Sequence, residues 1–152
     1  MVAVRQAAAG DVQALIPLVE NYWKFEGISG FDSNRIAAHI GRLLSEPRLG
    51  AGWIATSNGS VVGYLLAVYV FSLEHLGITA EIDEFFVLSA HRGRGIGAEL
   101  LKAAECEFRR VGCTNVSLQL SLRNNSARDF YRRYGYAERS AYEIMDRMLH
   151  DD

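Results

Sequence analysis

The chain has 152 residues, of which 49% are apolar and 22% charged, and its formal net charge is −2. This size and composition predict a single domain over residues 1–152 and exclude a disordered or low-complexity protein. Two cysteines exclude a disulfide framework, and no spacing of possible ligands predicts a metal site. The longest apolar run is too short to cross a bilayer and residues 1–5 do not start a signal peptide, so we expect a cytoplasmic protein without a membrane partner.

The charge is distributed unevenly along the chain. Up to Phe86 there are five Lys or Arg against nine Asp or Glu, and from Val87 onward there are eleven against nine. Such an asymmetry suits a protein whose first half attracts a cation and whose second half attracts an anion. The net negative charge and the lack of interleaved aromatic and basic residues argue against a nucleic-acid partner.

The apolar pattern predicts a mixed sheet with helices packed on it. After a first strand, helices are expected over 11–25 and from about 32 to 47. A hairpin turning at Asn58-Gly59 follows. The remaining predicted elements are a strand over 79–88, a helix over 96–110, an alternating strand over 116–122, a helix over 126–134, and two last strands near 136–139 and 142–148.

The first chemical motif joins the strand over 79–88 to the helix over 96–110. Three glycines at alternate positions, Gly93, Gly95 and Gly97, lead directly into the helix. Glycines let a phosphate approach the backbone, and the first N–H groups of a helix have no intrahelical partner. The motif therefore predicts a phosphate site. It lacks the lysine of a P-loop and has the wrong glycine spacing for a dinucleotide fold.

The second motif follows the alternating strand. Asn124 stands at the strand end, where its amide can bond a backbone-like group, and Tyr131 lies seven residues on in a short helix. A tyrosine there can direct its hydroxyl toward the sheet, although packing is the more common role of a helical tyrosine.

Together these motifs resemble those of the GNAT superfamily of acetyl-CoA-dependent N-acetyltransferases. Arg92-x-x-Gly95-x-Gly97 is similar to the pyrophosphate loop, and the stretch from Asn124 through Ala127 and Tyr131 to Tyr136 is similar to the second signature. The resemblance implies an α/β (α+β) fold: a mixed, mostly antiparallel twisted sheet, helices on both faces, and a splayed pair of parallel strands that binds acetyl-CoA. It also implies that no metal takes part.

The resemblance assigns the cofactor-binding residues by position. The backbone of Phe86, Val87 and Leu88 would pair with the pantetheine arm. Asn124 would hold the end of that arm, with Ala127 in the same signature, and Tyr131 would be the general acid that protonates the thiolate. The pyrophosphate would be bound by Arg92, Gly93, Arg94, Gly95, Ile96, Gly97 and Ala98.

The candidates for the general base lie just before the loop. Glu81, Asp83 and Glu84 fall within four residues, and period two places Asp83 and Glu84 on opposite faces unless a bulge intervenes. The segment over 82–87 is similar to the diamine (polyamine) acetyltransferases, in which the first acid of a pair serves the substrate amine. That position is Asp83 here, with the order of the two acids reversed. Asp83 or Glu84 is thus the hypothesised proton acceptor, directly or through water.

The acceptor is expected to be a small cationic molecule. Trp23 and Glu26 belong to an acidic, aromatic segment that suits a cation and would bind it together with Asp83. The predicted reaction moves acetyl from acetyl-CoA to a primary amine by direct transfer in a ternary complex. A protein or peptide amine as acceptor, or a non-catalytic acyl-CoA sensor, are the alternatives. The resemblance also suggests a homodimer formed through the C-terminal strands.

Overall fold

The computed structural model describes residues 1–150 and divides the chain into two compact units, Met1–Gln119 and the part from Leu120 onward. The sheet and its three long helices all belong to the first unit. The single domain expected over 1–152 stays a prediction.

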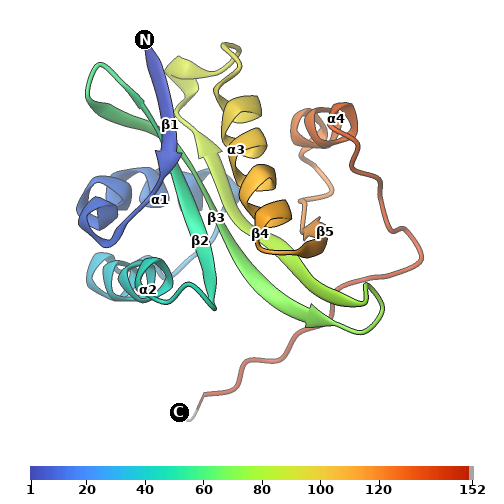
Figure 1. Cartoon of the computed structure of the whole chain (residues 1–152). Helices are drawn as coiled ribbons and strands as arrows, with labels where there is room; N and C mark the ends of the chain where they lie inside the picture. The colour runs from blue at the N-terminus through green and yellow to red at the C-terminus, as the bar shows by residue number, and fades with distance from the viewer. Residues whose placement is uncertain (151–152) are drawn as a thin grey trace. The chain divides into compact units, whose positions relative to one another are not determined.

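The first unit is built on a five-stranded sheet whose spatial order follows the chain, β1-β2-β3-β4-β5 (Figure 1). Neighbouring strands are antiparallel except β4 and β5, which are parallel. The mixed, mostly antiparallel sheet is therefore confirmed. The strands are β1 Val2–Gln6, β2 Gly50–Ser57, β3 Ser60–Ser72, β4 Gly77–Val87 and β5 Cys113–Leu118.

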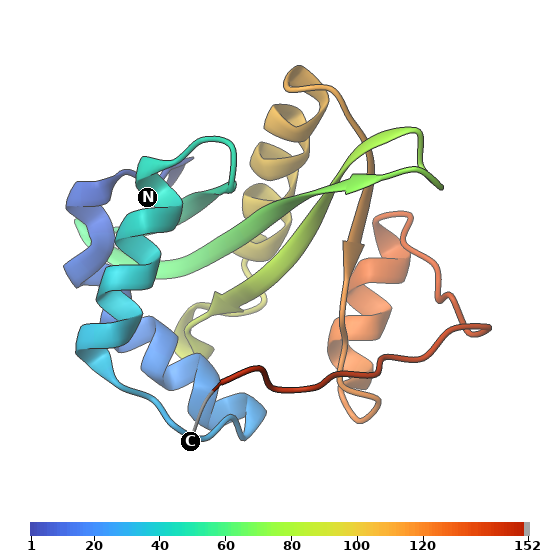
Figure 2. The same cartoon turned by 90° about the horizontal axis from the view of Figure 1, so that it is seen from below.

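Helices cover both faces of this sheet. The helices α1 (Val12–Glu26) and α2 (Ser33–Ser45) lie on one face, and α3 (Ile96–Arg110) lies on the other (Figures 1 and 2). The bounds of α3 are those predicted from the sequence. Local signals suffice there, because a glycine turn precedes an amphipathic segment that Gly112 ends.

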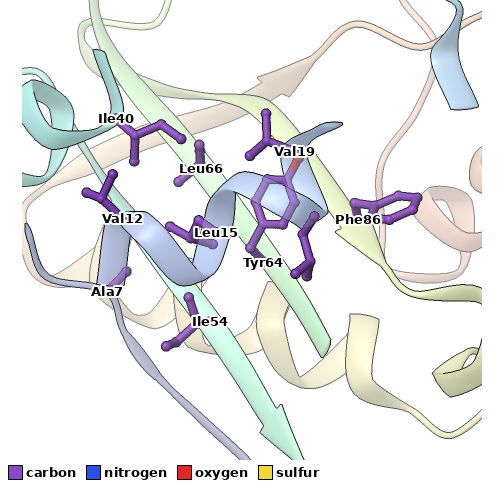
Figure 3. Packing of buried hydrophobic residues seen from close by; sticks show 10 residues of the cluster. Ala7, Val12, Leu15, Val19, Ile40, Ile54, Tyr64, Leu66 and Phe86 are labelled. Carbon is purple, nitrogen blue, oxygen red and sulfur yellow. The ribbon is translucent and has the colours of Figure 1, made fainter. Parts of the chain in front are cut away.

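Alternating side chains of β2 and β3 form the two halves of the core, as the period of a strand requires. Toward α1, the fully buried Ile54 and Tyr64 pack with Leu15 (Figure 3). Toward α3, the ring of Trp53 contacts that of Phe108 edge-on at 5.4 Å. Each face of the sheet is thus closed by an apolar layer of its own.

The parallel pair β4 and β5 separates before β4 ends. The ladder runs from Ile78↔Cys113 to Ile82↔Leu118, whereas β4 continues to Val87. β5 ends at Leu118 although the sequence alternates up to Leu122, and among the described residues Leu118 is also the last that pairs with β4. The strand also begins earlier than predicted, at Cys113.

In the second unit, the helix α4 (Asn125–Arg133) confirms the predicted short helix. Asn124 caps it, because its Oδ1 accepts the N–H of Ala127 at 3.0 Å. After Gly135, whose φ is +93°, Glu138 pairs with Arg132 at 2.7 Å. The unit is therefore a capped helix with a tethered segment after it.

The two last strands predicted near 136–139 and 142–148 are wrong. No residue from 136 to 150 is in a strand, and Tyr142, Ile144 and Met148 are exposed. Alternation supplies an apolar face, but a strand forms only where another strand pairs with its N–H and C=O groups. The described part of the chain provides no such neighbour for this segment.

Candidate active site

A β-bulge in β4 brings Asp83 and Glu84 into one neighbourhood. Leu66 of β3 is opposite Glu84, and the next residue, Ala67, is opposite Ile82, so that Asp83 is the extra residue on β4. Simple alternation would place the two acids on opposite faces. Instead, both carboxylates act electrostatically on the hydroxyl of Tyr22 on α1. The bulge therefore decides the question that the sequence left open.

Glu84 is held by two neutral donors, one on each carboxylate oxygen. The indole N–H of Trp23 donates to Oε2 at 2.8 Å, and the hydroxyl of Tyr64 donates to Oε1 at 2.9 Å. Desolvation raises the pKa of Glu84, the two hydrogen bonds lower it, and the charge of Asp83 raises it again. The net direction is upward, so the carboxylate is costly to ionise despite its two donors.

Asp83 differs from its neighbour because its carboxylate accepts no hydrogen bond from any described residue. Its side chain stays in contact with solvent, yet the surrounding protein desolvates it enough to raise its pKa. Within residues 1–150, no Lys or Arg forms an ion pair with Asp83 or Glu84. Two adjacent carboxylates without an internal counter-ion form a site for an external cation or for a shared proton.

Beyond the bulge, β4 has an edge that β5 does not cover. Leu88 donates its N–H to Val62 of β3 at 2.9 Å. Because groups along an antiparallel strand point alternately to either side, Phe86 also faces β3, whereas Phe85 and Val87 face the edge that β5 has left. Of the three residues expected to pair with the pantetheine arm, Val87 is the one whose backbone faces this edge.

The glycine loop presents backbone N–H groups without partners. Gly93 and Gly95 have φ values of +76° and +80°, which glycine adopts without strain, and no atom lies within 4 Å of where a Cβ would stand on either. The first bond of α3 runs from Glu99 to Gly95, so the N–H groups of Ile96, Gly97 and Ala98 have no acceptor within the helix. This open arrangement fits a pyrophosphate.

The side chains beside the loop differ in how far they are held by the protein. Arg92 donates through Nε to the Val87 carbonyl at 2.8 Å, and its guanidinium lies over the rings of Phe25 and Phe86 at 5.3 and 5.2 Å. The Nδ1 atom of His91 is buried without a partner. Arg94 is exposed. The loop thus combines an anchored arginine with a free one.

A family comparison supports this geometry. A profile described as the acetyltransferase (GNAT) family matches residues 16–136, which include the bulge, the loop and α4. The chain belongs to the GNAT family. The predicted acyltransferase class, with acetyl-CoA as the co-substrate, is thereby confirmed.

Named relatives agree with the family. The chain is 38% identical over 85 residues to the aminoalkylphosphonate N-acetyltransferase of Salmonella typhimurium; the match covers 56% of this chain and 55% of that protein. The chain thus spans about half the length of that relative. It is 27% identical over 146 residues to the uncharacterized N-acetyltransferase YhfO of Bacillus subtilis, covering 91% and 92% of the two chains.

A solved structure shows the same fold. A predicted acetyltransferase from Clostridium acetobutylicum, crystallised with acetyl-CoA, superposes with a TM-score of 0.82 over 96% of either chain at 18% identity. The GNAT fold inferred from the sequence, with its parallel pair and its helices on both faces, is confirmed. The finer likeness to diamine acetyltransferases stays a prediction.

The predicted GNAT site residues are distributed over both units. Trp23 and Glu26, both half-buried on α1, lie in the first unit with the two acids, and Glu26 is close enough to Tyr22 to raise the pKa of its hydroxyl. Tyr131 lies in the second unit, where its ring contacts those of Phe130 and Tyr136, each at 5.4 Å. The catalytic role of Tyr131 and the cofactor roles of Asn124 and Ala127 stay predictions.

The sequence analysis missed Tyr64. In a strand as apolar as β3 it looks like one more core aromatic, and it is in fact fully buried. A signal was available, since a buried phenol needs a hydrogen-bond partner. Its partner, Glu84, is 20 positions away and only the pairing of β3 with β4 reveals it.

Other parts of the described chain add no chemistry to the GNAT site. A cavity of about 460 Å³ is lined by Tyr69, Ile78 and Arg110, toward the other ends of β3, β4 and α3, and no predicted site residue lines it. Among residues 1–150, no three His, Cys, Asp or Glu side chains are grouped to hold a metal ion. Over the same range, no helix is long and apolar enough to span a membrane.

Proposed function

We propose that this protein transfers acetyl from acetyl-CoA to the primary amine of a small cationic molecule, directly within a ternary complex. The observation that carries the proposal is the pair Asp83 and Glu84, which has no internal counter-ion and stands where β4 and β5 separate. Acetyl-CoA supplies the activated acetyl group. The acid pair supplies what the amine needs, namely a negative field and a proton acceptor.

An ammonium group suits this acid pair for electrostatic reasons. Desolvation raises the pKa of both carboxyls, so each is stabilised by a positive charge brought beside it. Beside the pair stands the half-buried ring of Tyr22 on α1, and an aromatic face also attracts cations. A polar but uncharged or anionic acceptor would leave the two carboxylates without compensation.

The proposed steps divide among a few residues. Asp83 takes a proton from the ammonium, and the neutral amine then attacks the thioester carbonyl. A C–N bond forms and the C–S bond breaks, and the leaving thiolate takes a proton from Tyr131. The nitrogen loses its second proton as the tetrahedral intermediate collapses, and that proton restores the Tyr131 hydroxyl through solvent. The N–H groups of Ile96, Gly97 and Ala98 bind the pyrophosphate, and the outward backbone of Val87 pairs with the pantetheine arm.

The name of the relative from Salmonella typhimurium suggests one kind of acceptor amine. An aminoalkylphosphonate carries an amine and an anionic group on one small molecule. In this chain, an anionic group of that kind would need a cation near the acids, and the free Arg94 and the anchored Arg92 lie on the loop that we assign to the pyrophosphate. We therefore place polyamines and aminoglycosides ahead of aminophosphonates as acceptors. The homodimer and the cytoplasmic location stay predictions.

The test is release of coenzyme A from acetyl-CoA, measured with a thiol reagent against a panel of amines. The panel holds spermidine, putrescine, kanamycin, an aminoalkylphosphonate and a lysine peptide. We expect release with a di- or polycationic small amine and a reduced rate in Tyr131→Phe. Tyr134→Phe, the same change three residues further on, controls for effects on α4.

Two results would contradict the proposal. Faster turnover of the lysine peptide than of every small amine would show a protein acetyltransferase. Binding of acetyl-CoA without release of coenzyme A for any amine would favour an acyl-CoA sensor.

A further inference from the structure

Glu84 differs from the described carboxylates that pair with arginines. It is half-buried, and both of its oxygens are bound by neutral donors rather than by an arginine or lysine. The carboxylates of Asp11, Glu107 and Glu138, by contrast, each pair with an arginine near the surface. A neutral donor fixes a carboxylate without cancelling its charge, so Glu84 keeps its full field toward whatever binds beside it.

We infer that Trp23 and Tyr64 are positioning residues that act through Glu84, holding it as a fixed charge beside Asp83 so that Asp83 is left free to take the proton of the amine. This inference rests on the proposed function and deepens it. Trp23 therefore serves the substrate indirectly, through its N–H, rather than as an open aromatic wall. Tyr64 gains a role in the site although its ring belongs to the core.

The directions of the two bonds support this division. The indole N–H comes from α1, 61 positions away in sequence, and the phenol comes from β3, so the carboxylate is held between a helix and a strand. The ring of Trp23 is itself steadied by an edge-on contact with Phe31 at 5.8 Å. Neither oxygen of Glu84 can turn toward a substrate without giving up one of these bonds. Asp83, on the bulge, has none to give up.

The pKa of Glu84 depends on the groups that face it, so this pKa is the quantity to measure. Asp83 is next to Glu84 on β4, Tyr64 faces Glu84 from β3, and Tyr22 faces it from α1. Glu26, also on α1, acts electrostatically on Tyr22. Both tyrosines have a pKa raised by burial and by these carboxylates, so they stay neutral at physiological pH. Removal of one donor takes away a bond that favours the charged form and therefore raises the pKa of Glu84.

The two hydrogen bonds from Trp23 and Tyr64 to Glu84 are called the clamp below. An experiment on the indole N–H of Trp23 tests the clamp without relying on activity. The chain has two tryptophans, so a ¹⁵N-labelled sample gives two indole resonances, and Trp53→Phe assigns them. We expect the Trp23 resonance to titrate with a midpoint above the ordinary glutamate value. Tyr64→Phe should raise that midpoint by about one pH unit, the effect of one hydrogen bond to a charged group. Glu84→Gln should abolish the titration.

Kinetics then test the role of the clamp in catalysis. With the best amine of the panel, the acidic limb of kcat/KM against pH should move upward by about one unit in Trp23→Phe and in Tyr64→Phe. Tyr69→Phe, the same change on the same strand but against Phe108, should leave the limb in place. In a Glu84→Gln background, Trp23→Phe should add no further shift, because the two residues act through one contact.

Specific results would overturn the inference. An indole resonance of Trp23 that does not titrate, or that titrates equally in Glu84→Gln, would show that the clamp is absent in solution. A midpoint that moves while the kinetic limb stays would leave the clamp a structural contact only. A full effect of Trp23→Phe in the Glu84→Gln background would make Trp23 a direct substrate contact. A wild type that titrates as expected but acetylates no amine would contradict the proposed function itself.

Discussion

The two halves of β4 belong to one continuous strand but have different neighbours. From Ile78 to Ile82 the strand pairs with β3 on one side and with β5 on the other, and Ala80 is completely buried. From Asp83 to Val87 it pairs with β3 alone. The first half has a paired strand on either side. The second half has an open edge, a bulge and two carboxylates.

The difference shows how one strand serves both stability and chemistry. A segment with a strand on either side uses its backbone groups within the sheet and leaves few of them for a ligand. Where β5 turns away, the same strand directs the backbone groups of Phe85 and Val87 toward an edge that β5 no longer covers, and the Val87 carbonyl accepts Arg92 there. The change occurs within one residue, at Asp83, because the bulge and the end of the parallel ladder coincide there.

The largest effect is expected from Asp83→Asn, a change in the open half of β4. We expect the rate of acetyl transfer to fall by roughly 10²- to 10⁴-fold, the usual contribution of a general base. Stability should not fall, because partial desolvation by the surrounding protein disfavours the charge that the change removes. The measurement is kcat/KM beside a thermal melt. Glu46→Gln, an exposed acid paired with Arg42 at the end of α2, is the control. A rate within a few-fold of wild type would exclude Asp83 as the base.

In the paired half, Ile82→Ala should affect stability rather than chemistry. Ile82 is 5% exposed and is the last residue of β4 that pairs with β5. Its truncation leaves a cavity and should lower the free energy of unfolding by about 2–5 kcal/mol, measured by urea denaturation. Ile144→Ala, at a residue 65% exposed, should change it by less than about 0.5 kcal/mol. Equal losses in the two variants would contradict the comparison.

The smallest expected effect concerns the pH dependence of stability at Glu84. Its folded pKa lies above its ordinary value, so the wild type loses stability as pH rises from that value through the raised one. Glu84→Gln carries no charge and avoids this loss. Its melting temperature should therefore exceed that of wild type at pH 8 and approach it near pH 4. A variant that is less stable at pH 8 would show that the two hydrogen bonds outweigh desolvation.

Much of the molecule followed from local patterns. The helix α3 and its glycine turn, the hairpin at Asn58-Gly59 and the short helix α4 were all predicted, because caps, turns and helical periodicity act over a few neighbouring residues. The two acids of the candidate site were also found in this way. The final strands were not, since strand formation depends on a partner elsewhere in the chain.

The sequence by itself determined the order of the elements up to α4, the glycine turn before α3 and the presence of Asp83 and Glu84 on one strand. Only the tertiary structure decided that a bulge brings these two acids close together. It also decided that Trp23 and Tyr64 bind Glu84 and leave the Asp83 carboxylate free. The reason is the range of the interactions. A turn or a cap is settled by adjacent residues, whereas a strand register and a hydrogen bond across 61 positions exist only when distant segments pack together.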